Sequence, residues 1–196
     1  DMGLPDDAFV FCCFNNNYKI TNLEFDIWMM VLSKVEGSVL WLRRSNKLSD
    51  KNMIKEAQKR DVHASRLVFA DRVLMDEHLA RHKLADLLID TFAFNAHTTA
   101  SEALWAGLPV VTKTGQGFAA RVAGSLLNAV GLPELVTENE QDYEDLILDL
   151  ATNPNKLAKV KEKLANNRLS HPLFDTKLYT KHLEDGYQKA YQNYFC

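Results

Sequence analysis

The 196-residue sequence has few cysteines, no long apolar run and little excess charge of either sign. Its three cysteines, Cys12, Cys13 and Cys196, lack the paired spacing of a disulfide framework, which favours a reducing, cytoplasmic location. Adjacent residues of a strand point to opposite faces of the sheet, so Cys12 and Cys13 cannot easily reach one metal ion. We expect them to be small buried hydrophobic side chains.

Other absences exclude whole classes of protein. No apolar run approaches the roughly 18 residues of a membrane helix, and the first residues do not read as a signal peptide. The formal net charge is −3, and basic residues are interspersed with acidic ones. Neither a nucleic acid nor a membrane is therefore expected as a partner.

The motifs of several enzyme classes are also missing. No Gly-x-Gly-x-x-Gly follows a predicted strand, because Gly115-Gln116-Gly117 is too short a match, and this disfavours a dinucleotide cofactor. There is no Walker loop, no Gly-x-Ser-x-Gly elbow and no Cys-x-x-Cys. No Asp-x-Asp occurs either. We therefore expect neither a cofactor nor a metal site.

Short apolar runs alternate with segments of helical spacing along most of the chain. The pattern predicts strands at residues 10–14, 38–42, 67–70, 86–90 and 109–112. A helix opened by Thr21 follows the first strand, and further helices are predicted at 51–60, 76–82, 99–105 and 118–130. Parallel strands need crossover helices, so the alternation predicts an α/β fold, a doubly wound Rossmann-like parallel sheet.

The pattern changes after residue 137. Leu135 and Val136 are compatible with a short sixth strand, and helices are predicted at 139–150, 154–167 and 176–194. We therefore predict a single domain over residues 1–196, with a β/α sheet at about 1–137 and a helical C-terminal third at about 138–196.

Ligands of open α/β sheets bind beyond the carboxyl ends of the strands, so the loops there hold the candidate site residues. After the first strand, the amide of Asn16 and the ammonium group of Lys19 suit a polar ligand, and Lys19 suits a phosphate. Composition alone favours an ordinary turn with a solvated lysine over a ligand site.

Two further segments leave alternatives open. His97, Thr98 and Thr99 precede a predicted helix, whose N-terminus attracts anions. However, Thr99 and Glu102 also fit a capping box that satisfies only the backbone. His78 and Arg81 share a helix face after the third strand and suit either a nucleoside or solvent.

The sequence resembles the O-linked N-acetylglucosamine transferase family in one collinear order over almost its whole length. The motifs that carry the resemblance are Phe14-Asn15 with Tyr18-Lys19-Ile20, Ser38-Val39-Leu40-Trp41-Leu42, Asn95-x-His97-Thr98-Thr99, Leu104-Trp105-Ala106-Gly107-x-Pro109-Val110-Val111-Thr112, Ala119-x-Arg121-Val122-Ala123 and Pro172-Leu173-Phe174-Asp175-Thr176. Together these motifs are specific, although His97-Thr98-Thr99 alone is not.

The resemblance implies the C-terminal half of a GT-B catalytic unit, in which two Rossmann-like domains face each other, usually behind tetratricopeptide repeats. It implies a UDP-sugar donor, transfer of a sugar, N-acetylglucosamine in the named family, to Ser or Thr of an acceptor protein or peptide, and inactivity of this half alone. In the roles that the resemblance implies, Lys19 is catalytic and contacts the diphosphate, and Asn16, His97, Thr98 and Thr99 contact the phosphates. Glu102 contacts the ribose, His78 and Arg81 lie against the uridine, and the backbone near Val73 contacts the uracil.

The sequence departs from the family pattern at four places. Asn16 stands where the family often has glutamine, and Met75 where it usually has lysine. Ala100-Ser101-Glu102 replaces Gly-Met-Asp, and the segment 92–94 replaces Pro-Leu-Cys. The donor sugar, the acceptor and the oligomeric state therefore stay open. The competing hypotheses are another GT-B enzyme, such as an N-linking glucosyltransferase or a nucleotide-sugar epimerase, and a nucleotide-binding module without catalysis.

Overall fold

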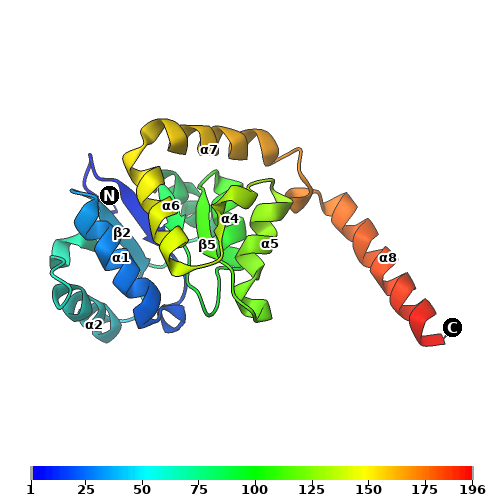
Figure 1. Cartoon of the computed structure of the whole chain (residues 1–196), viewed down its shortest axis with the longest axis horizontal. Helices are drawn as coiled ribbons and strands as arrows, with labels where there is room; N and C mark the ends of the chain where they lie inside the picture. The colour runs from blue at the N-terminus through cyan, green and yellow to red at the C-terminus, as the bar shows by residue number, and fades with distance from the viewer. Residues whose placement is uncertain (1, 196) are drawn as a thin grey trace.

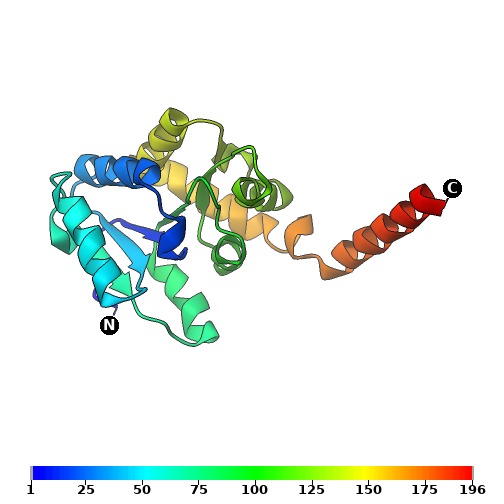
Figure 2. The same cartoon turned by 90° about the horizontal axis from the view of Figure 1, so that it is seen from below.

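The structure, a computed structural model, describes residues 2–195 and consists of a six-stranded sheet with helices on both faces (Figures 1 and 2). The strands are β1 (Val10–Cys13), β2 (Val39–Arg43), β3 (Leu67–Ala70), β4 (Leu87–Ile89), β5 (Val110–Lys113) and β6 (Val136–Thr137). The helices are α1 (Asn22–Lys34), α2 (Lys47–Gln58), α3 (Met75–Arg81), α4 (Thr98–Ala106), α5 (Val122–Ala129), α6 (Glu140–Thr152), α7 (Pro154–Asn167) and α8 (Thr176–Phe195).

All strand pairs are parallel, and the strand order is β3-β2-β1-β4-β5-β6. This order confirms the predicted doubly wound sheet, including its short sixth strand. The winding direction reverses between β1 and β4, which leaves a crevice beyond the carboxyl ends of these two strands. The loops after β1 and β4 therefore approach each other.

Local sequence signals account for where several helices begin and end. At the start of α1, the backbone N–H of Thr21 donates to the Glu24 carboxylate at 2.8 Å, as the capping-box pattern predicts. Helix α2 begins four residues earlier than predicted because the Asn46 side chain accepts from the backbone N–H groups of Leu48 and Ser49. Gly107 ends α4 with a φ of +88°, a conformation that suits glycine.

The predicted helix at 118–130 is interrupted near its start. Residues Phe118–Ala120 form a 3₁₀ turn, and α5 begins only at Val122. Three predicted C-terminal helices are present as α6, α7 and α8, which confirms a helical C-terminal third. The division into one domain is not decided by these observations and stays a prediction.

The sheet core is tied to the C-terminal third by buried aromatic side chains. Trp28 on α1 and Tyr143 on α6 are both fully buried, and the Trp28 indole donates to the Tyr143 hydroxyl at 3.1 Å. That hydroxyl in turn donates to the backbone carbonyl of Asp90, just after β4, at 2.9 Å. Helices α1 and α6 thus support the carboxyl end of a central strand.

Cys12 and Cys13 are fully buried and free, as predicted. Cys196 lies outside the described residues. Within residues 2–195, no helix is both long and apolar enough to cross a membrane.

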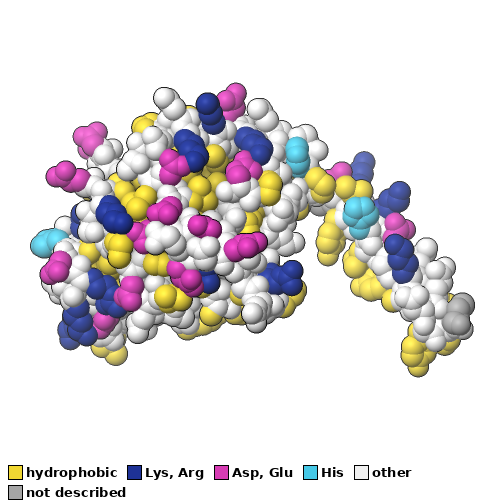
Figure 3. All heavy atoms as spheres, viewed as in Figure 1, with side chains coloured by type: hydrophobic (Ala, Val, Ile, Leu, Met, Phe, Trp, Pro, Cys, Tyr) yellow, Lys and Arg dark blue, Asp and Glu magenta, His cyan; other side chains and the backbone are white. Residues whose placement is uncertain are grey.

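Helix α8 extends away from the body of the molecule (Figures 1 and 2), and none of its residues is buried. Hydrophobic side chains gather along one edge of α8 in the view of Figure 3, whereas charged side chains occupy the other edge. The large exposed hydrophobic residues on it are Tyr179, Leu183, Tyr187, Tyr191, Tyr194 and Phe195.

Candidate functional site

A cavity of about 510 Å³ opens beyond the carboxyl ends of the central strands. The loops after β1 and β3 and the last residue of β2 contribute to it, together with helices α3 and α4. Eight of the nine predicted site residues line it: Asn16, Lys19, Val73, His78, Arg81, Thr98, Thr99 and Glu102. These eight residues, from three separate segments of the chain, are therefore brought together as the fold class implies.

His97 is placed differently from the other predicted residues. It is the N-cap residue of α4, but its side chain is not part of the cavity lining. Its Nε2 lies 3.2 Å from the Ala119 carbonyl oxygen, and its ring stacks on Phe94 with ring centroids 4.7 Å apart. In this structure, His97 supports the loop at the start of α4 with its side chain.

Lys19 lies in the loop after β1 and faces the loop after β4. Its Nζ donates to the backbone carbonyl of Asn95 at 3.0 Å and lies 3.9 Å from the centroid of the Phe94 ring. Partial burial lowers the pKa of Lys19, whereas the charges of Asp90 and Cys13 act in the opposite direction. The lysine is thus held in place beside the N-terminus of α4.

Helix α4 presents its first turn to the cavity. The first N–H groups of a helix have no partner within it, and the helix dipole makes this end positive. The helix begins at Thr98, and no side chain caps it. Thr98 and Thr99 therefore lie where an anion would be bound.

The structure decides between the two interpretations of Glu102. Helix α4 begins one residue earlier than predicted, so Thr99 is inside the helix and cannot be its N-cap. The Glu102 carboxylate instead lies 3.2 Å from Nε2 of His78 on α3, and both residues line the cavity. The capping-box interpretation of Thr99 and Glu102 is wrong.

Burial shifts the pKa values of His78 and Glu102 in opposite directions. It lowers the pKa of His78, with further lowering by Arg81 and Arg43, and it raises the pKa of Glu102. Both shifts have the same physical cause, because a less polar surrounding disfavours the charged form of each group. A ligand hydroxyl could accept from or donate to this pair.

Arg81 is the most buried cation of the site, with 5% of its surface exposed. Its guanidinium carbon lies 4.4 Å from the centroid of the Phe14 ring, and its Nη1 donates to the Asp71 carbonyl at 2.8 Å. Asn16 accepts a hydrogen bond from Arg43, at the end of β2. These contacts fix the side of the cavity next to β2 and α3.

Several cavity residues were missed by sequence reasoning. Arg43, Asp71 and Arg72 contribute charges, and Phe14, Asn15, Leu74 and Met75 complete the lining. The sequence could have identified Arg43 as a candidate site residue, because it directly follows the apolar run 39–42 and so lies at the carboxyl end of a strand. Among the lining residues, four are basic (Lys19, Arg43, Arg72 and Arg81) and two are carboxylates (Asp71 and Glu102). This balance suits an anionic ligand.

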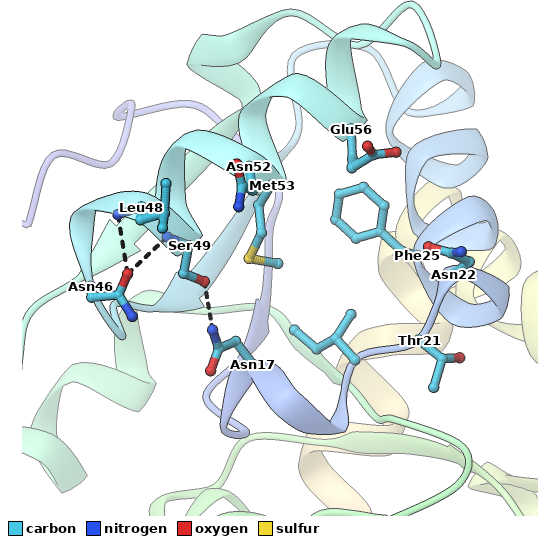
Figure 4. Close-up of a pocket in the computed structure, with 11 residues that line it drawn as sticks. Asn17, Thr21, Asn22, Phe25, Asn46, Leu48, Ser49, Asn52, Met53 and Glu56 are labelled. Carbon is cyan, nitrogen blue, oxygen red and sulfur yellow. Dashed lines mark hydrogen bonds between the residues drawn. The ribbon is translucent and has the colours of Figure 1, made fainter.

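A second cavity, of about 390 Å³, lies between the start of α1 and helix α2 (Figure 4). Its two walls are joined by a hydrogen bond from Asn17 to Ser49 at 2.5 Å. Amide and apolar side chains line it, among them Asn22, Phe25 and Met53, and the lining includes no Lys, Arg or His. It therefore lacks the charge that a diphosphate requires.

No group of three or more His, Cys, Asp or Glu side chains within residues 2–195 is arranged to hold a metal ion. The expectation of a metal-independent site stays a prediction.

The sequence matches the model of the family "Glycosyl transferase family 41" over residues 1–183. It is 39% identical over 191 residues to the UDP-N-acetylglucosamine–peptide N-acetylglucosaminyltransferase of Caenorhabditis elegans, a match that covers 97% of this chain and 17% of that protein. It is also 38% identical over 197 residues to the probable UDP-N-acetylglucosamine–peptide N-acetylglucosaminyltransferase SEC of Arabidopsis thaliana, covering 100% of this chain and 20% of that protein.

A solved structure agrees with these relatives. The K341M mutant of the Thermobaculum terrenum O-GlcNAc transferase superposes with a TM-score of 0.90 at 29% identity, over 96% of this chain and 39% of that one. The fold is thus that of one half of a GT-B glycosyltransferase, as predicted. The chain spans only 17% and 20% of the length of the two curated relatives named above. On the strength of the family match and these relatives, the chain belongs to glycosyl transferase family 41.

Proposed function

We propose that this chain is the UDP-sugar-binding half of a protein O-glycosyltransferase that transfers N-acetylglucosamine to Ser or Thr hydroxyls. The observation that carries this proposal is the meeting of Lys19 with the N-terminus of α4 in one basic cavity. A preorganised ammonium group and a helix N-terminus together bind a diphosphate. The curated relatives named above, whose names specify UDP-N-acetylglucosamine and a peptide, support the donor and the acceptor.

The placement of the side chains suggests how the donor lies. Val73, His78 and Arg81 occupy the side of the cavity next to β3 and α3, and we assign the uridine to them. Glu102 beside His78 suits the ribose hydroxyls. Lys19, Thr98 and Thr99 then receive the phosphates, together with Asn16, which its contact with Arg43 orients.

The chemistry follows from the charge that develops during transfer. As the bond between the sugar and UDP breaks, negative charge grows on the β-phosphate. Lys19 and the helix N-terminus neutralise that charge without reorganising, which stabilises the transition state more than the ground state. No metal ion is required in this scheme.

The remaining parts of the enzyme lie outside this chain in our proposal. A facing Rossmann-like domain supplies most of the acceptor site, and tetratricopeptide repeats precede it. The apolar edge of α8, a helix with no buried residue, fits a chain whose partner domain is elsewhere. Free buried cysteines fit the proposed cytoplasmic location.

We expect the chain to bind UDP and UDP-N-acetylglucosamine equally well with Mg²⁺ or with a chelator, because Lys19 and α4 provide the positive charge. Isothermal titration of UDP, UDP-N-acetylglucosamine and UDP-glucose, each with Mg²⁺ and with EDTA, measures this directly. Binding that disappears in EDTA would contradict metal independence. Absence of binding to all three nucleotides would contradict the proposed function.

We expect Glu102→Ala to weaken UDP binding by about tenfold, the effect of losing hydrogen bonds to a charged group. The free energy of unfolding should change by less than about 0.5 kcal/mol, because Glu102 is not a cap. Ser101→Ala, at the neighbouring position of the same helix, is the matched control. A chemical denaturation curve and a UDP titration of each variant separate the roles, and a loss of stability with intact affinity would make Glu102 structural.

A further inference from the structure

The Asp90 side chain, at the end of β4, is fully buried and lies outside the cavity lining. Its Oδ1 accepts from the backbone N–H of Ala96 at 2.6 Å, from the N–H of Thr91 at 2.8 Å and from the Asn15 amide at 3.1 Å. Its Oδ2 accepts from the Thr112 hydroxyl at 2.7 Å. One carboxylate thus joins β4, β5, the loop after β1 and the loop before α4.

The loop around Asp90 ends at the partner of Lys19. The Thr91 hydroxyl donates to the Phe94 carbonyl at 2.6 Å, and the Asn95 amide donates to the Thr91 carbonyl at 2.8 Å. These bonds direct the Asn95 carbonyl towards Nζ of Lys19, 3.0 Å away. The position of the lysine therefore depends on a loop that closes around Asp90.

Asp90 also acts on Lys19 through its charge. Burial lowers the pKa of Lys19, and the negative charge of Asp90 is the largest influence that opposes this lowering. Burial raises the pKa of Asp90 itself to about 6, while its hydrogen bonds lower it, so the carboxylate is ionised at neutral pH.

Other titratable groups surround the pair on the packed elements. They are Cys13 on β1, Glu24 on α1, Arg43 on β2, His78 and Arg81 on α3, His97 and Glu102 at α4, Lys113 on β5, and Tyr143 on α6. Among them, Cys13 is the other group whose charge acts on Lys19, and burial raises its pKa to values at which it is a neutral thiol. Asp90 is therefore the anion that acts on Lys19 at neutral pH.

We propose that Asp90 is a positioning residue of the donor site: from behind the cavity it orders the loop before α4 and keeps Lys19 cationic and aimed at the diphosphate. This inference rests on the proposed function for the role of Lys19, although its electrostatic part is measurable without a nucleotide.

The decisive substitution is Asp90→Asn. The asparagine oxygen retains the three N–H donors that Oδ1 accepts from, and its amide group donates to the Thr112 hydroxyl, so mainly the charge is removed. In the unliganded chain, the alkaline titration of Lys19, followed by NMR of ¹³C-labelled lysine and assigned with Lys19→Gln, should move to lower pH. Asp86→Asn, at the opposite end of the same strand, should leave it unchanged. Coincident titrations of wild type and Asp90→Asn would overturn the inference, as would an equal shift in Asp86→Asn.

A second measurement covers the case in which Asp90→Asn does not fold. The wild-type Lys19 resonance should show an inflection near pH 6, where Asp90 takes up its proton. Thr112→Val removes a hydrogen bond that lowers the pKa of Asp90, so this inflection should move to higher pH. An inflection that stays in place arises from a histidine and contradicts the inference.

Nucleotide binding completes the test. At pH 7, Asp90→Asn should bind UDP about tenfold more weakly than the wild type, with a further loss as the pH rises. If the wild type does not bind UDP, the proposed function fails, and the Lys19 titration still decides the role of Asp90. UDP affinity in Asp90→Asn equal to that of the wild type from pH 7 to pH 9 would overturn the inference.

Discussion

Replacing Lys19 with alanine in the complete enzyme is expected to lower kcat by about 10²–10³-fold, with a much smaller effect on donor affinity. The reason is that charge on the β-phosphate grows towards the transition state, so a contact with it contributes more there than in the ground state. Lys19 is held for this purpose by the Asn95 carbonyl and the Phe94 ring. Steady-state kinetics with a peptide acceptor measure the effect.

The matched control is Lys47→Ala, an exposed lysine at the start of α2, which should leave kcat unchanged. A Lys19→Ala enzyme with normal kcat and a raised KM would make Lys19 a residue of ground-state binding only.

The 196-residue chain alone should transfer no sugar, because a GT-B site lies between two domains. Measurable transfer by this chain would contradict the proposal that it is half of an enzyme.

The largest effect on stability is expected from Trp28→Ala, which should lower the free energy of unfolding by about 3–5 kcal/mol. Trp28 lies on α1 and is fully buried against the C-terminal third, where its indole donates to the Tyr143 hydroxyl. The substitution removes this hydrogen bond and leaves a cavity beneath the carboxyl end of β4. Urea denaturation followed by circular dichroism measures the loss.

Two further variants show how the loss arises. Trp28→Phe keeps most of the packing and loses the hydrogen bond, so it should cost about 1–3 kcal/mol. Leu23→Ala, on the same helix but 50% exposed, should stay within about 0.5 kcal/mol of the wild type. If Trp28→Ala costs no more than Leu23→Ala, helix α1 does not pack on α6 as the structure shows.

The local features of this protein followed from its sequence because their causes lie within a few residues. Apolar runs such as 39–42 form strands buried on both faces, and Thr21 with Glu24 opens α1 through a contact three residues long. The alternation of strands and helices implied a parallel sheet, since parallel strands need crossovers. The site roles came from the family resemblance. Local patterns alone did not distinguish these site residues from residues of ordinary turns and helix caps.

Only the tertiary structure decided which of these segments meet. The strand order places β1 beside β4, and this brings Lys19 to Asn95, 76 residues further along the chain. The partner of Glu102 proved to be His78 on another helix, because α4 begins one residue earlier than its pattern suggested. Asp90 reads in sequence as the end of an apolar strand, and two of its four hydrogen bonds come from distant parts of the chain, the Asn15 amide and the Thr112 hydroxyl. Contacts of this kind depend on how the sheet is wound, which local propensity does not specify.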